Sequence, residues 1–212
     1  MNTKGYFIIG TDTDIGKTYV SSRIVKYFKD KNINTGYYKA ALSGMEKVDN
    51  ELVPHDAKYV CDYAGITKSP KDFVSYSYVE EVSPHLAARR IGEHIQMSKI
   101  KCDFEKICNE YDMVIAEGSG GILCPIYLDD IEPLMLEDIV RLTEFPVILV
   151  ADAGLGTINH TLLTINYLNQ KDFKIAAVIL NRYDENNFMH KDNKEVIEKF
   201  SNVKLFTLPY QV

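Results

Sequence analysis

A short apolar run that leads into a loop ending in Gly-Lys-Thr constrains the fold of this chain more than any other feature. The stretch YFIIGTDTDIGKTYVSS (residues 6–22) has strand character first, then a polar loop, and from Lys17 onward a helical period. In this order of elements, the backbone N–H groups of the loop and the positive end of the helix dipole face an anion. Lys17 supplies a point charge for terminal phosphates, and the Thr18 hydroxyl is a ligand for Mg²⁺. The stretch therefore favours nucleotide phosphate binding over a simple strand-to-helix turn.

Two aspartates set this loop apart from the common phosphate loop. Aligned on Gly-Lys-Thr, Thr11 stands where the first glycine is usual, and Gly10 comes one residue earlier. Asp12 and Asp14 would repel a triphosphate unless a cation or an ammonium group lies between them. Two interpretations stay open: the carboxylates face a cationic partner, or they orient the loop through hydrogen bonds to its backbone.

Strand and helix patterns alternate along the whole chain. Continuous apolar runs, typical of strands buried on both faces, occur at residues 6–10, 36–40, 112–118, 146–152, 174–182 and 203–208. Stretches of helical period include residues 17–31, 85–96, 137–143, 160–168 and 193–200. The pattern predicts an α/β fold, a single domain over residues 1–212 with a mostly parallel central sheet flanked by helices on both faces, as in P-loop NTPases. The loosest part of the chain is expected at residues 43–56.

Charge, cysteine usage and hydropathy narrow the function classes. The formal net charge of −6 argues against a surface for nucleic acid or anionic membrane. No apolar run approaches the roughly 20 residues that span a bilayer, and the start of the chain lacks the pattern of a signal peptide. The four cysteines show no CxxC spacing, which fits a reducing cytoplasm. We expect a soluble, cytoplasmic protein whose partners are small molecules or protein.

Charged side chains near other strand ends extend the candidate site. Glu117 ends the run MVIAE, where its carboxylate can reach the same Mg²⁺ as Thr18; a role in a turn or helix cap is the alternative. Asp56 is either a further metal ligand or an acid in the first turn of a helix. Lys39 ends a second strand and should pair with an acid or meet an anionic intermediate, and its spacing does not decide between them. Ligands of parallel sheets bind beyond the carboxyl ends of the strands, so these residues are expected at one edge.

The motifs as a set resemble one known family. They are GTDTDIGKT, KAALSG, SPH at residues 83–85, EGSGG, GLGTINH at residues 154–160 and NR at residues 181–182. In this order, over nearly the whole chain, the set resembles the dethiobiotin synthetases, whose own phosphate loop carries the extra residue before Gly-Lys-Thr. Single motifs are shared with related deviant P-loop ATPases, but the combination with KAALSG and GLGTINH is specific. Two departures, Ala40 in place of the usual proline and Ser119 in place of alanine, remove no reacting group.

The resemblance implies an ATP- and Mg²⁺-dependent ligase of biotin biosynthesis. Such an enzyme converts 7,8-diaminopelargonate and CO2 into the cyclic urea dethiobiotin, with ADP and phosphate, through a carbamate and a phosphorylated carbamate. The implied catalytic residues are Lys39, Lys17, Thr13 and Ser43. The implied Mg²⁺ ligands are Thr18, Asp56 and Glu117. The implied nucleotide contacts are Asp14, Ile15, Gly16, Lys17, Thr18, Tyr19, Asp56, Glu117, Gly118, Ser119, Gly120, Asn181, Arg182, Leu208, Pro209 and Tyr210, with Asn181 at the adenine edge.

The resemblance also implies a homodimer whose substrate site is shared across the interface. Thr13, Lys39 and Ser43 would contact the diamine or its carbamate. The substrate carboxylate would meet the neighbouring subunit at backbone N–H groups that open a helix; in this chain these belong to Gly156, Thr157 and Asn159. A positively charged diamine would also give the acids of the phosphate loop a cationic partner.

Two other functions are compatible with such a fold. A switch ATPase of the partition or septum-placement type dimerises on ATP and binds a protein partner. Those proteins typically carry a second lysine early in the loop, as in KGGxxKG, and GTDTDIGK has none. A cobyrinate-type amidotransferase would need an attached glutaminase domain, for which the chain has no room. Stimulation of ATP hydrolysis by a protein partner or DNA, without any diamine, would favour the switch ATPase.

Overall fold

The structure is a computed structural model that describes residues 3–129 and 133–209. Its strands are β1 (Lys4–Gly10), β2 (Thr35–Ser43), β3 (Met45–Val48), β4 (Glu51–Pro54), β5 (Val74–Tyr78), β6 (Met113–Gly121), β7 (Pro125–Tyr127), β8 (Leu134–Met135), β9 (Val147–Asp152), β10 (Ile175–Asn181) and β11 (Leu205–Leu208). Its helices are α1 (Lys17–Asp30), α2 (His55–Ala64), α3 (Pro84–Ile91), α4 (Met97–Glu110), α5 (Leu136–Thr143), α6 (Thr157–Gln170) and α7 (Phe188–Ser201), with a 3₁₀ turn, η1, at Pro70–Phe73. Within the described ranges, none of these helices is long and apolar enough to cross a bilayer.

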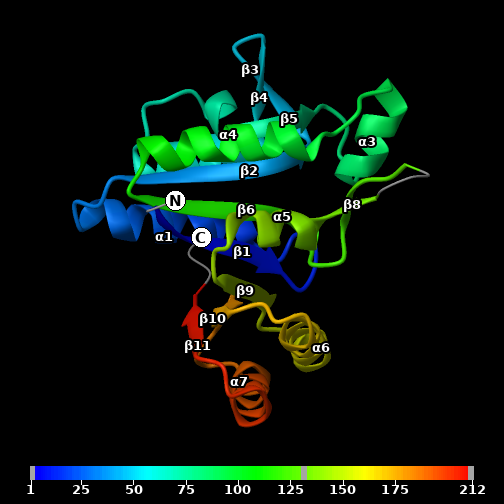
Figure 1. The fold of residues 1–212 in the computed structure, drawn as a ribbon. Helices are drawn as coiled ribbons and strands as arrows, with labels where there is room; N and C mark the ends of the chain where they lie inside the picture. Colours follow the sequence, from blue (N-terminus) through cyan, green and yellow to red (C-terminus); the bar gives the residue numbers. More distant parts are fainter. Residues whose placement is uncertain (1–2, 130–132, 210–212) are drawn as a thin grey trace.

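The centre of the molecule is a seven-stranded sheet in the order β11-β10-β9-β1-β6-β2-β5. Every neighbouring pair in it is parallel. In Figure 1, α1 lies behind the sheet, and α4 and α5 lie in front of it. This arrangement confirms the predicted α/β class, with a parallel central sheet and helices on both faces. Because the strands run in one direction, the loops after β1, β2, β6, β9 and β10 meet at one edge.

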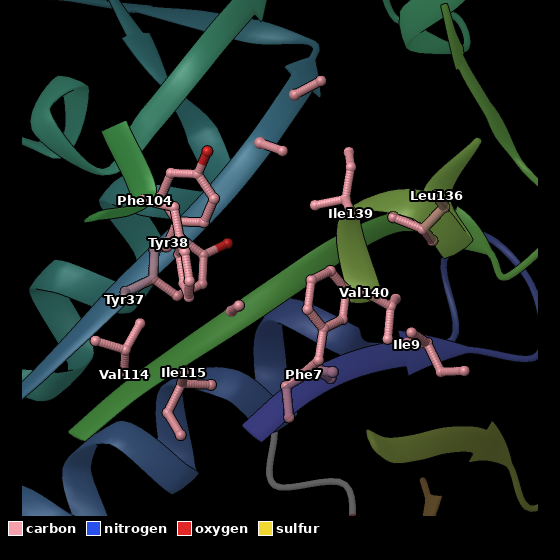
Figure 2. Packing of buried hydrophobic residues seen from close by; sticks show 14 of the residues in the cluster. Phe7, Ile9, Tyr37, Tyr38, Phe104, Val114, Ile115, Leu136, Ile139 and Val140 are labelled. Carbon is pink, nitrogen blue, oxygen red and sulfur yellow. The ribbon is translucent and has the colours of Figure 1, made fainter. Parts of the chain in front are cut away.

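Both faces of the sheet are buried, which is why its strands read as continuous apolar runs. Figure 2 shows Phe7 and Ile9 on β1, with Leu136, Ile139 and Val140 of α5 nearby. Successive side chains on a strand point to opposite faces. Tyr37 and Tyr38 on β2 therefore serve different layers, and the ring of Tyr38 lies 5.3 Å from that of Phe104 on α4.

Several predicted boundaries need correction. The helix expected over residues 85–96 ends at Ile91, because Gly92 adopts a left-handed conformation (φ 70°) that closes it. The segment 43–56, expected to be the loosest part, is mostly an antiparallel hairpin of β3 and β4. Asp49 and Asn50 both have positive φ, as a two-residue hairpin turn requires. Asp56 lies in the first turn of α2, the helical position that was one of its two predicted interpretations. The strand β5 and the helix α4 lie in segments for which the sequence patterns predict no element.

Candidate functional site

The loop between β1 and α1 forms a cradle at the carboxyl edge of the sheet. Gly16 caps α1 with φ 89°, and helix α1 begins at Lys17. The Lys17 side chain is buried and folds back, so that its Nζ donates a 2.8 Å hydrogen bond to Asp12 O. A Cβ atom at Gly10 would lie 3.1 Å from Lys17 Cδ, so glycine lets the lysine stem pass close to the backbone. An ammonium group and a helix N-terminus thus meet where an anion would bind.

Lys39 stands at the centre of the charged side chains. Its Nζ donates to Asp56 Oδ2 at 2.5 Å and to Glu117 Oε1 at 2.9 Å. The Thr18 hydroxyl donates to the same Glu117 oxygen at 2.8 Å. The β2–β6 register pairs Lys39 with Glu117, and Asp56 lies in the first turn of α2. Four elements, α1, β2, α2 and β6, therefore bring the three predicted Mg²⁺ ligands together with Lys39.

The charges of this cluster stabilise one another. Burial acts to lower the pKa of Lys39, but the carboxylates of Asp56 and Glu117 outweigh it and raise that pKa above its ordinary value. Burial acts to raise the pKa of Asp56, and the Lys39 ammonium outweighs it and lowers that pKa. Lys17 differs, since its pKa is lowered by burial and by the positive charge of Lys39. A bound polyanion would place negative charge directly beside Lys17.

Glu117 has a further partner that sequence reasoning missed. The hydroxyl of Tyr37, a fully buried residue, donates a 3.0 Å hydrogen bond to Glu117 Oε2. The alternation of side chains along a strand could have indicated this contact. Tyr37 lies two residues before Lys39 and therefore shares its face of β2.

Known proteins with similar sequences agree on one family. Residues 4–211 match the family described as AAA domain. The ATP-dependent dethiobiotin synthetase BioD of Clostridium botulinum strain Eklund 17B is 50% identical over 204 residues, which cover 96% of this chain and 89% of that protein. The protein of the same name from strain Loch Maree is 48% identical over the same shares. The chain belongs to the dethiobiotin synthetase family. Its relatives are ATP-dependent ligases by name, so the predicted enzyme class is confirmed at that level.

Solved structures similar to this family member share its fold. The MinC:MinD cell division complex of Aquifex aeolicus aligns with 99% of this chain and 82% of that chain, with a TM-score of 0.61 and 16% identity. A ParA family ATPase from Chlorobium tepidum gives a TM-score of 0.59 at 12% identity, over 99% of this chain and 85% of that chain. At these identities the likeness shows the P-loop NTPase fold alone.

Other residues implied by the dethiobiotin synthetase motifs lie on the loops around the cradle. Asn181 Nδ2 donates to Ile15 O at 2.8 Å, while Arg182 bonds Asp14 O and pairs with Asp152. These contacts tie the end of β10 to the phosphate loop. The hydroxyl of Tyr19 donates to Pro209 O at 3.3 Å, which brings the segment after β11 to the same place. Tyr210 lies outside the described residues.

The residues predicted to contact substrate occupy the same edge. A Cβ atom at Gly120 would lie 3.7 Å from the Thr13 hydroxyl, so the loops after β1 and β6 meet there. The Ser119 hydroxyl donates to Ala41 O at 2.5 Å, which links β6 to β2 just before Ser43. The peptide of Gly118 runs beside Leu136.

The turn at residues 154–159 opens α6, as its motif predicted. Gly156 has φ 90° and precedes the first helical residue, Thr157. The Thr157 side chain is buried, with its hydroxyl 3.3 Å from that of Thr161. Its N–H donates to Gly154 O, so both the hydroxyl and the amide of Thr157 have partners within the chain. Asn159 is exposed on the first turn.

Two surface hollows lie away from this site. A cavity of about 400 Å³ borders Asn34 and Tyr111, and another of about 530 Å³ borders Lys4 and Asp112. Both lie at the amino ends of β1, β2 and β6, opposite the charged cluster. Neither hollow is lined by Lys17, Lys39 or Glu117.

Proposed function

We propose that this chain catalyses the ATP- and Mg²⁺-dependent conversion of 7,8-diaminopelargonate and CO2 into dethiobiotin, ADP and phosphate. The observation that carries the proposal is the position of Lys39, a buried ammonium group at the edge of a phosphate cradle, between two carboxylates. Relatives at about 50% identity bear the name of this activity. The positive charge at Lys39 suits an anionic intermediate beside the nucleotide.

The nucleotide would bind along the cradle. Its phosphates would meet the Lys17 ammonium and the N–H groups at the start of α1. Within the described residues, Asn181 Oδ1 is buried without a hydrogen-bond partner. An amide oxygen in this position can accept from the amino group of adenine, and Leu208 and Pro209 would line the base.

The donor set near Lys39 fits Mg²⁺, which prefers oxygen ligands and keeps several waters. The Thr18 hydroxyl and the Glu117 carboxylate are in contact, and Asp56 is joined to Glu117 through Lys39. Thr18, Asp56 and Glu117 would hold the ion together with the phosphates. When bound, the ion would supply positive charge against the phosphate oxygens.

The proposed reaction requires the site to hold the two substrate amines, CO2 and the γ-phosphate of ATP close together. One substrate amine attacks the carbon of CO2 and loses a proton, which gives a carbamate. A carbamate oxygen attacks the γ-phosphorus and displaces ADP. The second amine then attacks the same carbon, loses a proton and expels phosphate, which closes the cyclic urea. Lys39 would stabilise the anionic carbamate and its phosphorylated form, and Thr13 and Ser43 would orient the amines by hydrogen bonds.

The carboxylate of the substrate would be held by a second copy of the chain. Gly156, Thr157 and Asn159 open α6, and the positive end of a helix stabilises an anion. A homodimer would place this turn opposite the substrate amines of its partner. This arrangement makes dimerisation a requirement for substrate binding.

Mass spectrometry of the reaction products tests the function. The protein is incubated with ATP, Mg²⁺, bicarbonate and 7,8-diaminopelargonate, and each component is omitted in turn. Dethiobiotin should form in the complete mixture and in none of the incomplete ones. Hydrolysis of ATP without dethiobiotin would refute the substrate assignment and favour the switch ATPase, which shares the fold of MinD and ParA.

A further inference from the structure

A buried tyrosine without a role in the proposed reaction contacts the central carboxylate of the site. Tyr37 is fully buried on β2, and its hydroxyl donates to Glu117 Oε2 at 3.0 Å. The side chain of Glu117 is itself inaccessible to solvent. Its other oxygen, Oε1, accepts hydrogen bonds from Thr18 and Lys39. The two carboxylate oxygens therefore have separate partners.

The register of β2 with β6 explains how Tyr37 reaches Glu117. Lys39 pairs with Glu117, and Tyr37 pairs with Ile115. Because side chains two apart on a strand share a face, Tyr37 approaches the carboxylate from deeper in the sheet than Lys39 does. Tyr38 points to the opposite face, where its hydroxyl contacts Ser75 Oγ and Ile100 O. Figure 2 shows the two neighbouring rings on β2.

A neutral phenol suits this position. The phenol O–H of tyrosine is a hydrogen-bond donor at neutral pH, and it lies 3.0 Å from a carboxylate oxygen, which can only accept. In the part of the chain that the structure describes, Tyr37 is the one hydrogen-bond donor to Glu117 Oε2. This bond restrains rotation of the carboxylate, and Oε1 stays directed at Thr18 and Lys39.

We propose that Tyr37 is a positioning residue that orients the Glu117 carboxylate for cation binding. The inference rests on the proposed function, in which Glu117 is a ligand of Mg²⁺. When a residue that hydrogen-bonds to a metal ligand is mutated, metal affinity typically falls by about 10- to 100-fold. Removing the hydroxyl of Tyr37 should weaken cation binding and leave the phosphate loop intact.

The test is a Mg²⁺ titration of nucleotide binding, with Tyr37→Phe compared with Tyr38→Phe. Each variant removes one buried phenol oxygen, but only the first removes a contact with Glu117. A fluorescent ADP analogue is bound first in EDTA and then at rising Mg²⁺ concentration. Tyr37→Phe should match the unaltered protein in EDTA and need on the order of tenfold more Mg²⁺ for the metal-dependent gain in affinity. Tyr38→Phe should need no more Mg²⁺ than the unaltered protein.

An equal Mg²⁺ requirement in the two variants would overturn the proposal. Weaker analogue binding by Tyr37→Phe in EDTA would also count against it, because a general structural role acts without the metal. The variant Glu117→Gln separates the possible failures. If it alone raises the Mg²⁺ requirement, Glu117 remains a metal ligand and the role of Tyr37 falls. If neither Glu117→Gln nor Tyr37→Phe does, the assignment of Glu117 falls with the proposal, while dethiobiotin formation is decided by its own assay.

Discussion

Among single residues, Lys39 should matter most for turnover. Its buried ammonium lies at the edge of the phosphate cradle. Among the ion pairs of the described residues, Lys39 is the one cation that pairs with Asp56 and Glu117. Lys39→Ala should lower the rate of dethiobiotin formation on the order of 100-fold, as loss of one oriented electrostatic group does. The rate is measured from product mass at saturating substrates. Lys26→Ala, which removes an exposed lysine paired with Asp30 on α1, should leave it unchanged, and near-normal turnover of Lys39→Ala would refute the role of this lysine.

The same ion pair predicts a pH dependence of stability. The pKa of Asp56 in the fold is below its ordinary value of 3.8. Its contribution to the free energy of unfolding is therefore present above about pH 4 and lost as the pH falls through the lowered pKa. The pKa of Lys39 is raised above 10.5, so its contribution is present below that pH and is lost as the pH rises through the raised pKa.

Urea unfolding of Asp56→Asn against the unaltered protein measures the acid side of this dependence. The difference in the free energy of unfolding should hold near neutral pH and shrink as the pH falls below about 4. Asp62→Asn changes an exposed acid that pairs with Lys58 on the same helix and should show a small difference throughout. A difference for Asp56→Asn that is constant with pH would show that the ion pair contributes no pH-dependent stability.

Among the elements, the turn that starts α1 tolerates no side chain. Gly16 has φ 89°, and a Cβ atom there would lie 2.1 Å from Asn181 Nδ2. Gly16→Ala should abolish nucleotide binding, because Asn181 would have to leave the loop. Gly65→Ala is the matched control, since Gly65 also has positive φ (64°) but no atom within 4 Å of the added carbon.

Gly65→Ala should cost about 1–2 kcal/mol of stability from backbone strain alone and bind the nucleotide normally. Both variants are compared by binding of an ADP analogue and by thermal unfolding. Equal binding by the two alanine variants would contradict the role of the contact between Gly16 and Asn181.

Sequence patterns predicted those secondary-structure elements whose own residues carry a clear signal. The continuous apolar runs predicted six of the seven strands of the sheet, because strands buried on both faces carry no polar alternation. The strand β5 was missed, since VSYSY alternates serine with tyrosine at the sheet edge. The helix α4 lies outside the predicted helices, although its apolar positions Ile100, Phe104 and Ile107 do have helical spacing.

For the site, the sequence predicted the candidate residues but not the contacts between them. Lys39, Asp56 and Glu117 were predicted as candidates from their residue types and strand ends, yet spacing alone could not say which of them would touch. Their contacts depend on the order β1-β6-β2 of the sheet, which no single segment encodes. Tyr37 reads as one more buried aromatic residue, and only the β2–β6 register reveals that its hydroxyl meets a carboxylate.

For the whole molecule, the proposed site shared between two subunits predicts complementation between inactive variants. Asn159→Asp places a negative charge on the first turn of α6, where a helix tolerates it but the substrate carboxylate would be repelled. This variant and Lys39→Ala should each be nearly inactive alone. In a mixture of equal parts, half of the dimers would be mixed and each would carry one intact site, so roughly a quarter of full activity should return. No recovery after subunit exchange, verified by native mass spectrometry, would mean that each site lies within one subunit.

The most direct measurement follows the carbon of bicarbonate into product. With ¹³C-bicarbonate, ATP, Mg²⁺ and 7,8-diaminopelargonate, the urea carbon of dethiobiotin should carry the label, and one ADP should form for each dethiobiotin. Labelled dethiobiotin in equal amount with ADP would support the proposed ATP-coupled carboxylation at the cradle around Lys17 and Lys39. Formation of ADP without labelled dethiobiotin would contradict the proposed reaction.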